Sequence, residues 1–180
     1  MRFCSIASGS SGNCIYVGSE NTHVLVDTGI SGKKMEAGLN SLDLTGRDLD
    51  GILITHEHSD HIKGLGVISR KYGIPIYTTG GTVDAMVRTN ALGKIPDGIF
   101  HEIKEDEPFE IGDLTVNPFS IPHDAAQPVG YRLECDGHSV GIATDLGKYN
   151  DYIIENLQNL DALLWTVSYT HLTLPTKLEV

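Results

Sequence analysis

Apolar residues in this chain fall into short blocks, and their spacing alternates between the period of a strand and that of a helix. Runs rich in β-branched residues and bounded by Gly, Ser, Asn or Asp predict strands. These runs cover 2–7, 14–17, 23–26, 51–55, 74–78, 99–100, 114–119, 129–133 and 140–143. Apolar residues three or four positions apart predict helices with one buried face. These stretches cover 33–42, 62–72, 83–92 and 149–160.

Local turn signals complete this pattern. Gly80, Gly81 and Thr82 predict a turn and an N-cap before the helix at 83–92. A further apolar run begins at 161–164. β-rich blocks alternate with single helices without a strict βαβ rhythm, and 180 residues are enough for one domain with its own core. The pattern therefore predicts an α+β fold in which layered sheets are flanked by helices.

Composition excludes several classes of protein. Hydrophobic residues make up 40% of the chain and charged residues 21%, which is an ordinary globular mix. No run of 18 apolar residues occurs, and the N-terminus lacks the apolar segment of a signal peptide, so we expect a cytoplasmic protein without a membrane span. The cysteines Cys4, Cys14 and Cys135 are too sparse for a disulfide framework or a thiolate zinc site.

The formal net charge of −11 argues against broad, charge-driven binding to nucleic acid or to anionic membranes. A nuclease remains compatible with this charge, because bound divalent cations would reverse the local field at the site.

A cluster of metal-binding side chains directly follows the strand predicted at 51–55. Residues 55–61 read Thr-His-Glu-His-Ser-Asp-His. His56 and His58 are two positions apart and can point the same way, while Asp60 and His61 would begin a helical turn. Imidazole nitrogen and carboxylate oxygen are ordinary ligands of Zn²⁺ and also suit Mn²⁺ or Fe. The segment therefore predicts a metal centre.

The order of these residues resembles that of the metallo-β-lactamase superfamily, whose fold is an αββα sandwich. Alone, Asp27, His123 and Asp145 would each also suit a turn, a strand end or a helix cap. Their places around 55–61 match the superfamily's remaining motifs. The resemblance implies two metal ions, the first held by His56, His58 and His123, the second by Asp60 and His61, with Asp145 bridging and Asp27 orienting a ligand histidine.

Two positions narrow the branch of the superfamily. His58 stands where flavodiiron proteins have Glu, which disfavours oxygen reduction. Asp145 stands where zinc β-lactamases have Cys, which disfavours antibiotic hydrolysis. A closer resemblance is to the bacterial YycJ/WalJ-like proteins, carried by 8–13, 55–61, 123–131 and 143–147.

That resemblance implies a phosphodiesterase or DNA exonuclease with a DNA substrate, using a hydroxide shared by two Zn²⁺ or Mn²⁺ ions. Asp60 is the expected proton acceptor, supported by Asp27. Small residues and free N–H groups in 8–13 suit contact with a phosphate, so Ser10 and Asn13 are candidate substrate contacts. The same segment also suits a plain turn.

The resemblance covers about residues 1–164, and 165–180 reads as a tail foreign to the family. We expect the domain to be truncated, with the second metal lacking its final histidine. His171 would replace that ligand only by accident. Two alternatives stay open, namely a hydrolase of another ester such as a thioester, and a fragment that binds metal without catalysis.

Overall fold

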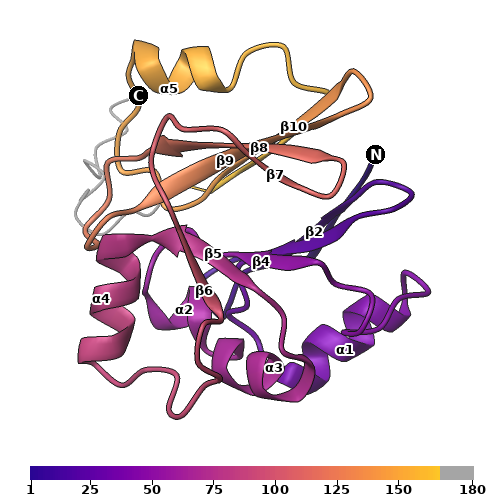
Figure 1. The fold of residues 1–180 in the computed structure, drawn as a ribbon. Coiled ribbons are helices and arrows are strands. Elements are labelled where there is room, and N and C mark those ends of the chain that lie inside the picture. Colours follow the sequence, from indigo (N-terminus) through magenta and orange to yellow (C-terminus); the bar gives the residue numbers. More distant parts are fainter. Residues whose placement is uncertain (167–180) are drawn as a thin grey trace, which may run out of the picture.

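The computed structural model describes residues 1–166 and shows two β-sheets packed face to face between layers of helices (Figure 1). The first sheet contains six strands in the order β1-β2-β3-β4-β5-β6. β1 and β2 pair antiparallel, as do β2 and β3, whereas β3 to β6 are parallel. The strands are β1 Arg2–Ala7, β2 Cys14–Gly18, β3 His23–Val26, β4 Gly51–Leu53, β5 Ile76–Thr79 and β6 Phe100–Ile103.

The second sheet contains five strands in the order β11-β10-β9-β8-β7. All neighbours pair antiparallel except β10 and β11, which are parallel. The strands are β7 Phe109–Ile111, β8 Leu114–Ser120, β9 Val129–Cys135, β10 His138–Ala143 and β11 Ala162–Trp165. The sequence pattern missed β7, which is only three residues long.

Helices cover the outer faces of both sheets (Figure 1). They are α1 Gly32–Asn40, α2 Ser59–Ile62, α3 Leu65–Tyr72, α4 Gly80–Arg88 and α5 Asp151–Asn156. The first four lie beside the first sheet, and α5 lies over the second. The αββα layering implied by the resemblance is therefore confirmed. Within residues 1–166, no helix is both long enough and apolar enough to cross a membrane.

Two predicted helix boundaries were wrong for local reasons. The helix expected at 62–72 is interrupted at Gly64, whose N–H donates to the Thr28 carbonyl. A Cβ at Gly64 would lie 2.2 Å from the Ile30 carbonyl oxygen, so this close approach requires glycine. The next helix begins at Gly80 and takes Thr79 as its N-cap instead of Thr82.

The core has three parts that match the layers. One lies between the first sheet and its helices, a second between the two sheets, and a third under α5. The outer face of the second sheet is covered less completely, since Leu163 and Trp165 on β11 are each 41% exposed.

Candidate metal centre

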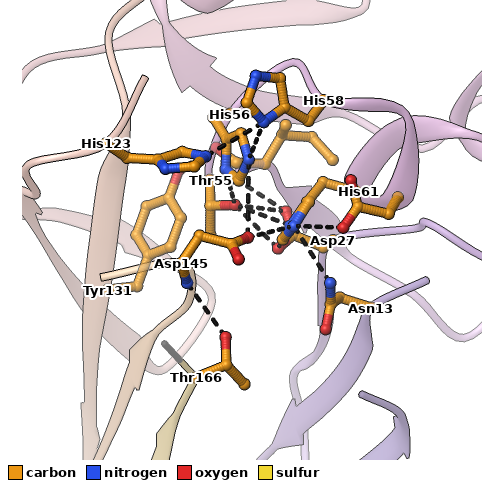
Figure 2. A network of polar contacts seen from close by, with 12 residues as sticks. Asn13, Asp27, Thr55, His56, His58, His61, His123, Tyr131, Asp145 and Thr166 are labelled. Carbon is orange, nitrogen blue, oxygen red and sulfur yellow. Dashed lines mark hydrogen bonds and ion pairs between the residues drawn. The ribbon is translucent and has the colours of Figure 1, made fainter. Parts of the chain in front are cut away.

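The metal-binding side chains predicted from the sequence gather where the carboxyl ends of several strands meet, at the seam between the two sheets (Figure 2). Asp27 follows β3, and His56 lies three residues beyond the end of β4. His123 follows β8 and Asp145 follows β10, so the second sheet contributes to the same point. Residues far apart in the chain thus converge because their strands end at one edge.

Three histidines form the first group of candidate ligands. His56, His58 and His123 each offer a ring nitrogen, and these atoms all lie within 4.8 Å of one another. His58 Nδ1 is 3.1 Å from His56 Nε2 and 3.1 Å from His123 Nε2. Nitrogen ligands at about 2.0–2.1 Å from a tetrahedral Zn²⁺ would be about 3.3 Å apart, so these separations suit a shared ion.

The hydroxyl of Thr55 fixes the orientation of His56. Thr55 Oγ1 donates to the Asp27 carboxylate and lies 3.0 Å from His56 Nδ1, from which it can accept. With Nδ1 engaged in this way, the lone pair of His56 sits on Nε2 and faces the other histidines. Burial, reinforced by the neighbouring histidines, lowers the pKa of His56 well below its ordinary value. A neutral ring is the form that binds metal.

His61 belongs to a second group with His56 and Asp145, whose ligand atoms also lie within 4.8 Å of one another. His61 Nδ1 is 2.7 Å from Asp27 Oδ2, and His61 Nε2 is 2.7 Å from Asp145 Oδ2. Burial alone would lower the pKa of His61, but Asp27, Asp145 and Asp60 together raise it to about 12. Carboxylates on both sides thus favour positive charge at this position, which a cation on Nε2 would supply equally well.

Asp60 lies beside this second group rather than inside it. Its Oδ2 is 3.5 Å from His61 Nε2, and its side chain is 32% exposed. A hydrogen bond from His61 lowers the pKa of the Asp60 carboxyl. Asp60 is therefore ionised and lies close enough to interact with an ion bound to His61.

Both site aspartates at strand ends adopt a left-handed backbone conformation. Asp27 has φ 61° and Asp145 has φ 56°. Non-glycine residues rarely adopt positive φ, and Asp tolerates it better than most. The turn at each strand end redirects the side chain, so each carboxylate reaches His61 (Figure 2).

Thr166 holds the Asp145 turn, and no sequence signal pointed to it. Its hydroxyl accepts from the Asp145 N–H at 3.1 Å, and its N–H donates to the Ala143 carbonyl. Its carbonyl accepts from the Leu146 N–H. Thr166 belongs to the stretch that was expected to be a tail foreign to the family, yet it bonds the backbone of the predicted ligand Asp145 and of two residues close to it, Ala143 and Leu146. Thr55 was likewise missed as the link between Asp27 and His56.

The remaining predicted site residues have different surroundings. Asn13 is buried, with its amide nitrogen 3.1 Å from His61 Nε2. Ser10 is exposed on the same loop. His171 lies outside the described residues.

The donor set fits a divalent cation on chemical grounds. His58 Nδ1 carries at most one hydrogen, which can serve only one of its two nitrogen neighbours. The three ring nitrogens therefore face one point but do not carry enough hydrogen atoms to form a hydrogen bond at every short contact between them. A metal ion would satisfy all of them at once, and His61 Nε2 with the carboxylates of Asp60 and Asp145 lies next to the same point.

Comparison with known families agrees with this geometry. The family described as the Beta-lactamase superfamily domain matches residues 22–175. The chain belongs to this superfamily. The resemblance inferred from the sequence is therefore confirmed at the level of the family.

Curated members of this superfamily resemble the chain closely in sequence. The exodeoxyribonuclease YycJ of Bacillus anthracis is 41% identical over 151 residues, which are 84% of this chain and 56% of that protein. The exodeoxyribonuclease WalJ of Streptococcus pneumoniae is 39% identical over 163 residues, which are 91% of this chain and 61% of that protein. The chain thus spans only about three fifths of the length of these relatives.

Solved structures of other proteins share the fold. The Rm3 metallo-beta-lactamase aligns with a TM-score of 0.67 at 20% identity, over 83% of this chain and 61% of that one. Zn²⁺-bound PqqB from Methylobacterium extorquens aligns with a TM-score of 0.71 at 18% identity, over 86% of this chain and 59% of that one. At these identities the similarity supports the fold only.

Proposed function

We propose that this chain is the metal-binding part of a hydrolase that cleaves phosphodiesters, with DNA as the substrate and exonucleolytic cleavage as the reaction. The observation that carries the proposal is the convergence of His56, His58 and His123 beside His61 and Asp145 at one seam. Similarity to two exodeoxyribonucleases supports the choice of substrate. Replacement of the lactamase cysteine by Asp145 argues against antibiotic hydrolysis.

We assign the first ion to the three histidines and the second to His61, Asp60 and Asp145, with Zn²⁺ or Mn²⁺ as the metal. Bound divalent ions would polarise a phosphoryl oxygen and supply a water that is acidic near neutral pH. The chain's own residues do the remaining work. Asp27 and Thr55 hold the rings of His61 and His56 so that one nitrogen of each faces the seam. This limits the motion of the ligands and raises their basicity.

Asp60 is the proposed proton acceptor. Its carboxyl has a lowered pKa and is partly exposed, so it is ionised and reachable by solvent. It lies beside His61, where a proton leaving an attacking water would need a base within hydrogen-bond reach. Asp27 is unsuited to this task because it is fully buried and already accepts from Thr55 and His61. We therefore give Asp27 an orienting role.

The test compares substrates on the same metal-loaded preparation. Bis-p-nitrophenyl phosphate and a linear DNA duplex are assayed beside nitrocefin and a glutathione thioester, with Mn²⁺ or Zn²⁺ added. We expect hydrolysis of the phosphodiesters only, and its loss in His58→Ala. Turnover of the thioester with the phosphodiesters untouched would reassign the substrate, and no turnover of any substrate at full metal content would indicate a silent fragment.

A further inference from the structure

The loop at 8–13 lies against the second group of ligands, although it supplies none of them. The Asn13 N–H donates to the Asp60 carbonyl at 2.8 Å, and the Gly29 N–H donates to the Asn13 carbonyl at 2.7 Å. Inside the loop, the Gly12 N–H donates to the Gly9 carbonyl at 3.0 Å. The backbone of the loop is thus tied to the segments that follow Asp27 and precede His61.

Two glycines give the loop its backbone conformation, and one of them, Gly12, also permits the close approach. Gly9 has φ 127° and Gly12 has φ 138°, a region that side chains disfavour. A Cβ at Gly12 would lie 2.3 Å from the Gly29 carbonyl oxygen. A plain turn would need no such contact. Gly12 therefore allows the loop to lie directly against Gly29, next to Asn13.

The orientation of the Asn13 amide follows from its partners. The Gly9 N–H donates to one terminal atom of the side chain at 3.0 Å, and a backbone N–H can only donate, so that atom is Oδ1. The NH2 group must then face the opposite way, where His61 Nε2 lies 3.1 Å off. Asn13 is only 3% exposed, so neighbouring atoms hold this arrangement.

The Asn13 NH2 group loses its hydrogen-bond acceptor when a metal ion binds to His61. His61 Nδ1 is engaged by Asp27, so a metal must use Nε2, and a nitrogen that binds a metal cannot accept a hydrogen bond. Among residues 1–166, His61 Nε2 is the one contact that the structure gives this amide nitrogen. A buried donor left in this way is costly unless a ligand accepts from it.

From this geometry we infer that Asn13 Nδ2 donates a hydrogen bond to a phosphoryl oxygen of the substrate or product bound beside His61. The 8–13 loop holds the Asn13 amide in the orientation that this hydrogen bond needs. The inference rests on the proposed function, because it takes a phosphate ester as the ligand. A negatively charged oxygen is the best acceptor for such a donor. Asn13 would thus contribute to binding without holding metal.

The test measures binding of thymidine 5′-monophosphate by calorimetry to the metal-loaded chain. Asn13→Asp keeps the oxygen that Gly9 needs but replaces the donor with a second oxygen. Asn13→Ala removes both contacts. We expect each variant to bind the nucleotide about 10- to 100-fold more weakly, the range for a lost hydrogen bond to a charged group. Metal content should equal that of the unmodified chain in Asn13→Ala. Ser11→Ala, an exposed position on the same loop, is the control and should bind normally.

Three results would overturn the inference. The first is nucleotide affinity of Asn13→Ala within twofold of the unmodified chain. The second is parallel loss of metal and nucleotide in that variant, which would make Asn13 a support for His61. The third is an unmodified, metal-loaded chain that binds no nucleotide. DNA cleavage is measured on the same samples. If nucleotide binding depends on Asn13 but the chain does not cleave DNA, the proposed function is refuted and this inference is not.

Discussion

Asp27 Oδ2 accepts a hydrogen bond from His61 Nδ1 over 2.7 Å, deep in the protein where neither side chain is exposed. The same carboxylate accepts from the Thr55 N–H at 2.9 Å. Its two oxygens are therefore committed to different donors. This arrangement decides which nitrogen of His61 is free for a metal ion.

Asp27→Asn should weaken metal binding at His61 by about 10- to 100-fold, the usual effect of losing an outer partner of a ligand. The new amide must keep its oxygen toward the Thr55 N–H, so its NH2 group would face His61 Nδ1. That ring would then carry its hydrogen on Nε2 and lose the lone pair that binds metal. Calorimetric titration with Mn²⁺ measures the effect, and Asp48→Asn on the surface is the control. Equal affinities in the two variants would refute the orienting role.

His58→Ala should remove the metal of the first group, roughly one equivalent per chain, because two nitrogens alone make a poor site for Zn²⁺. Elemental analysis of purified protein gives the metal content. His138→Ala is a matched control, since His138 is 60% exposed and lies on β10 away from the ligands. Unchanged content in His58→Ala would contradict the assignment of this group.

Gly29→Ala should destabilise the fold by about 1–3 kcal/mol, as expected of overpacking, and weaken metal binding near Asp60. An added Cβ would lie 1.6 Å from the Asp60 carbonyl oxygen, so the Asp60 backbone must move. Gly73→Ala is the comparison, because Gly73 has φ 68° but open space around it. That variant should cost about 1 kcal/mol from backbone strain alone and leave metal binding intact. Thermal unfolding and metal titration separate the two effects.

Asp113, just before β8 in the second sheet, accepts hydrogen bonds from Ser19 and Asn21 in the turn between β2 and β3 of the first sheet. Acid should weaken this contact between the two sheets. Hydrogen bonds from Ser19, Thr22 and Asn21 lower the pKa of this carboxyl from 3.8 to about 2. Because the folded-state pKa is depressed, the stabilisation is complete above about pH 4 and is lost as the pH falls toward 2. Asp113→Asn should be less stable than the unmodified chain at pH 7, and the gap in melting temperature should close near pH 2. A gap that stays constant with pH would show that the charge is irrelevant.

The local part of the site was predictable from sequence, and the long-range part was not. His56, His58, Asp60 and His61 lie in one short segment after a strand, so their types and spacing alone indicate a metal centre. His123 and Asp145 reach it only through the pairing of the second sheet, and the resemblance to a family was needed to select them.

Two residues that support the site could not be recognised from the sequence. Thr55 acts by contacting two site residues at once, and Thr166 acts through the turn that carries Asp145. A threonine in a strand or beside one is ordinary, so its role appears only when the partners are in place. The full break of the helix at Gly64 could not be predicted for the same reason, since the carbonyl that crowds this residue belongs to Ile30.

The candidate ligands come from both sheets, so the stability of the fold should depend on the concentration of metal. An ion that binds the native chain and not the unfolded one stabilises it by mass action, by about 2.7 kcal/mol at a hundredfold excess over its Kd. His56 and His58 follow the first sheet and Asp145 follows the second, so this linkage acts on the docking of the two sheets. A chelator should therefore lower the unfolding temperature of the entire domain instead of loosening one loop. A cell that withholds the metal would then shorten the lifetime of the protein as well as stop the proposed hydrolysis.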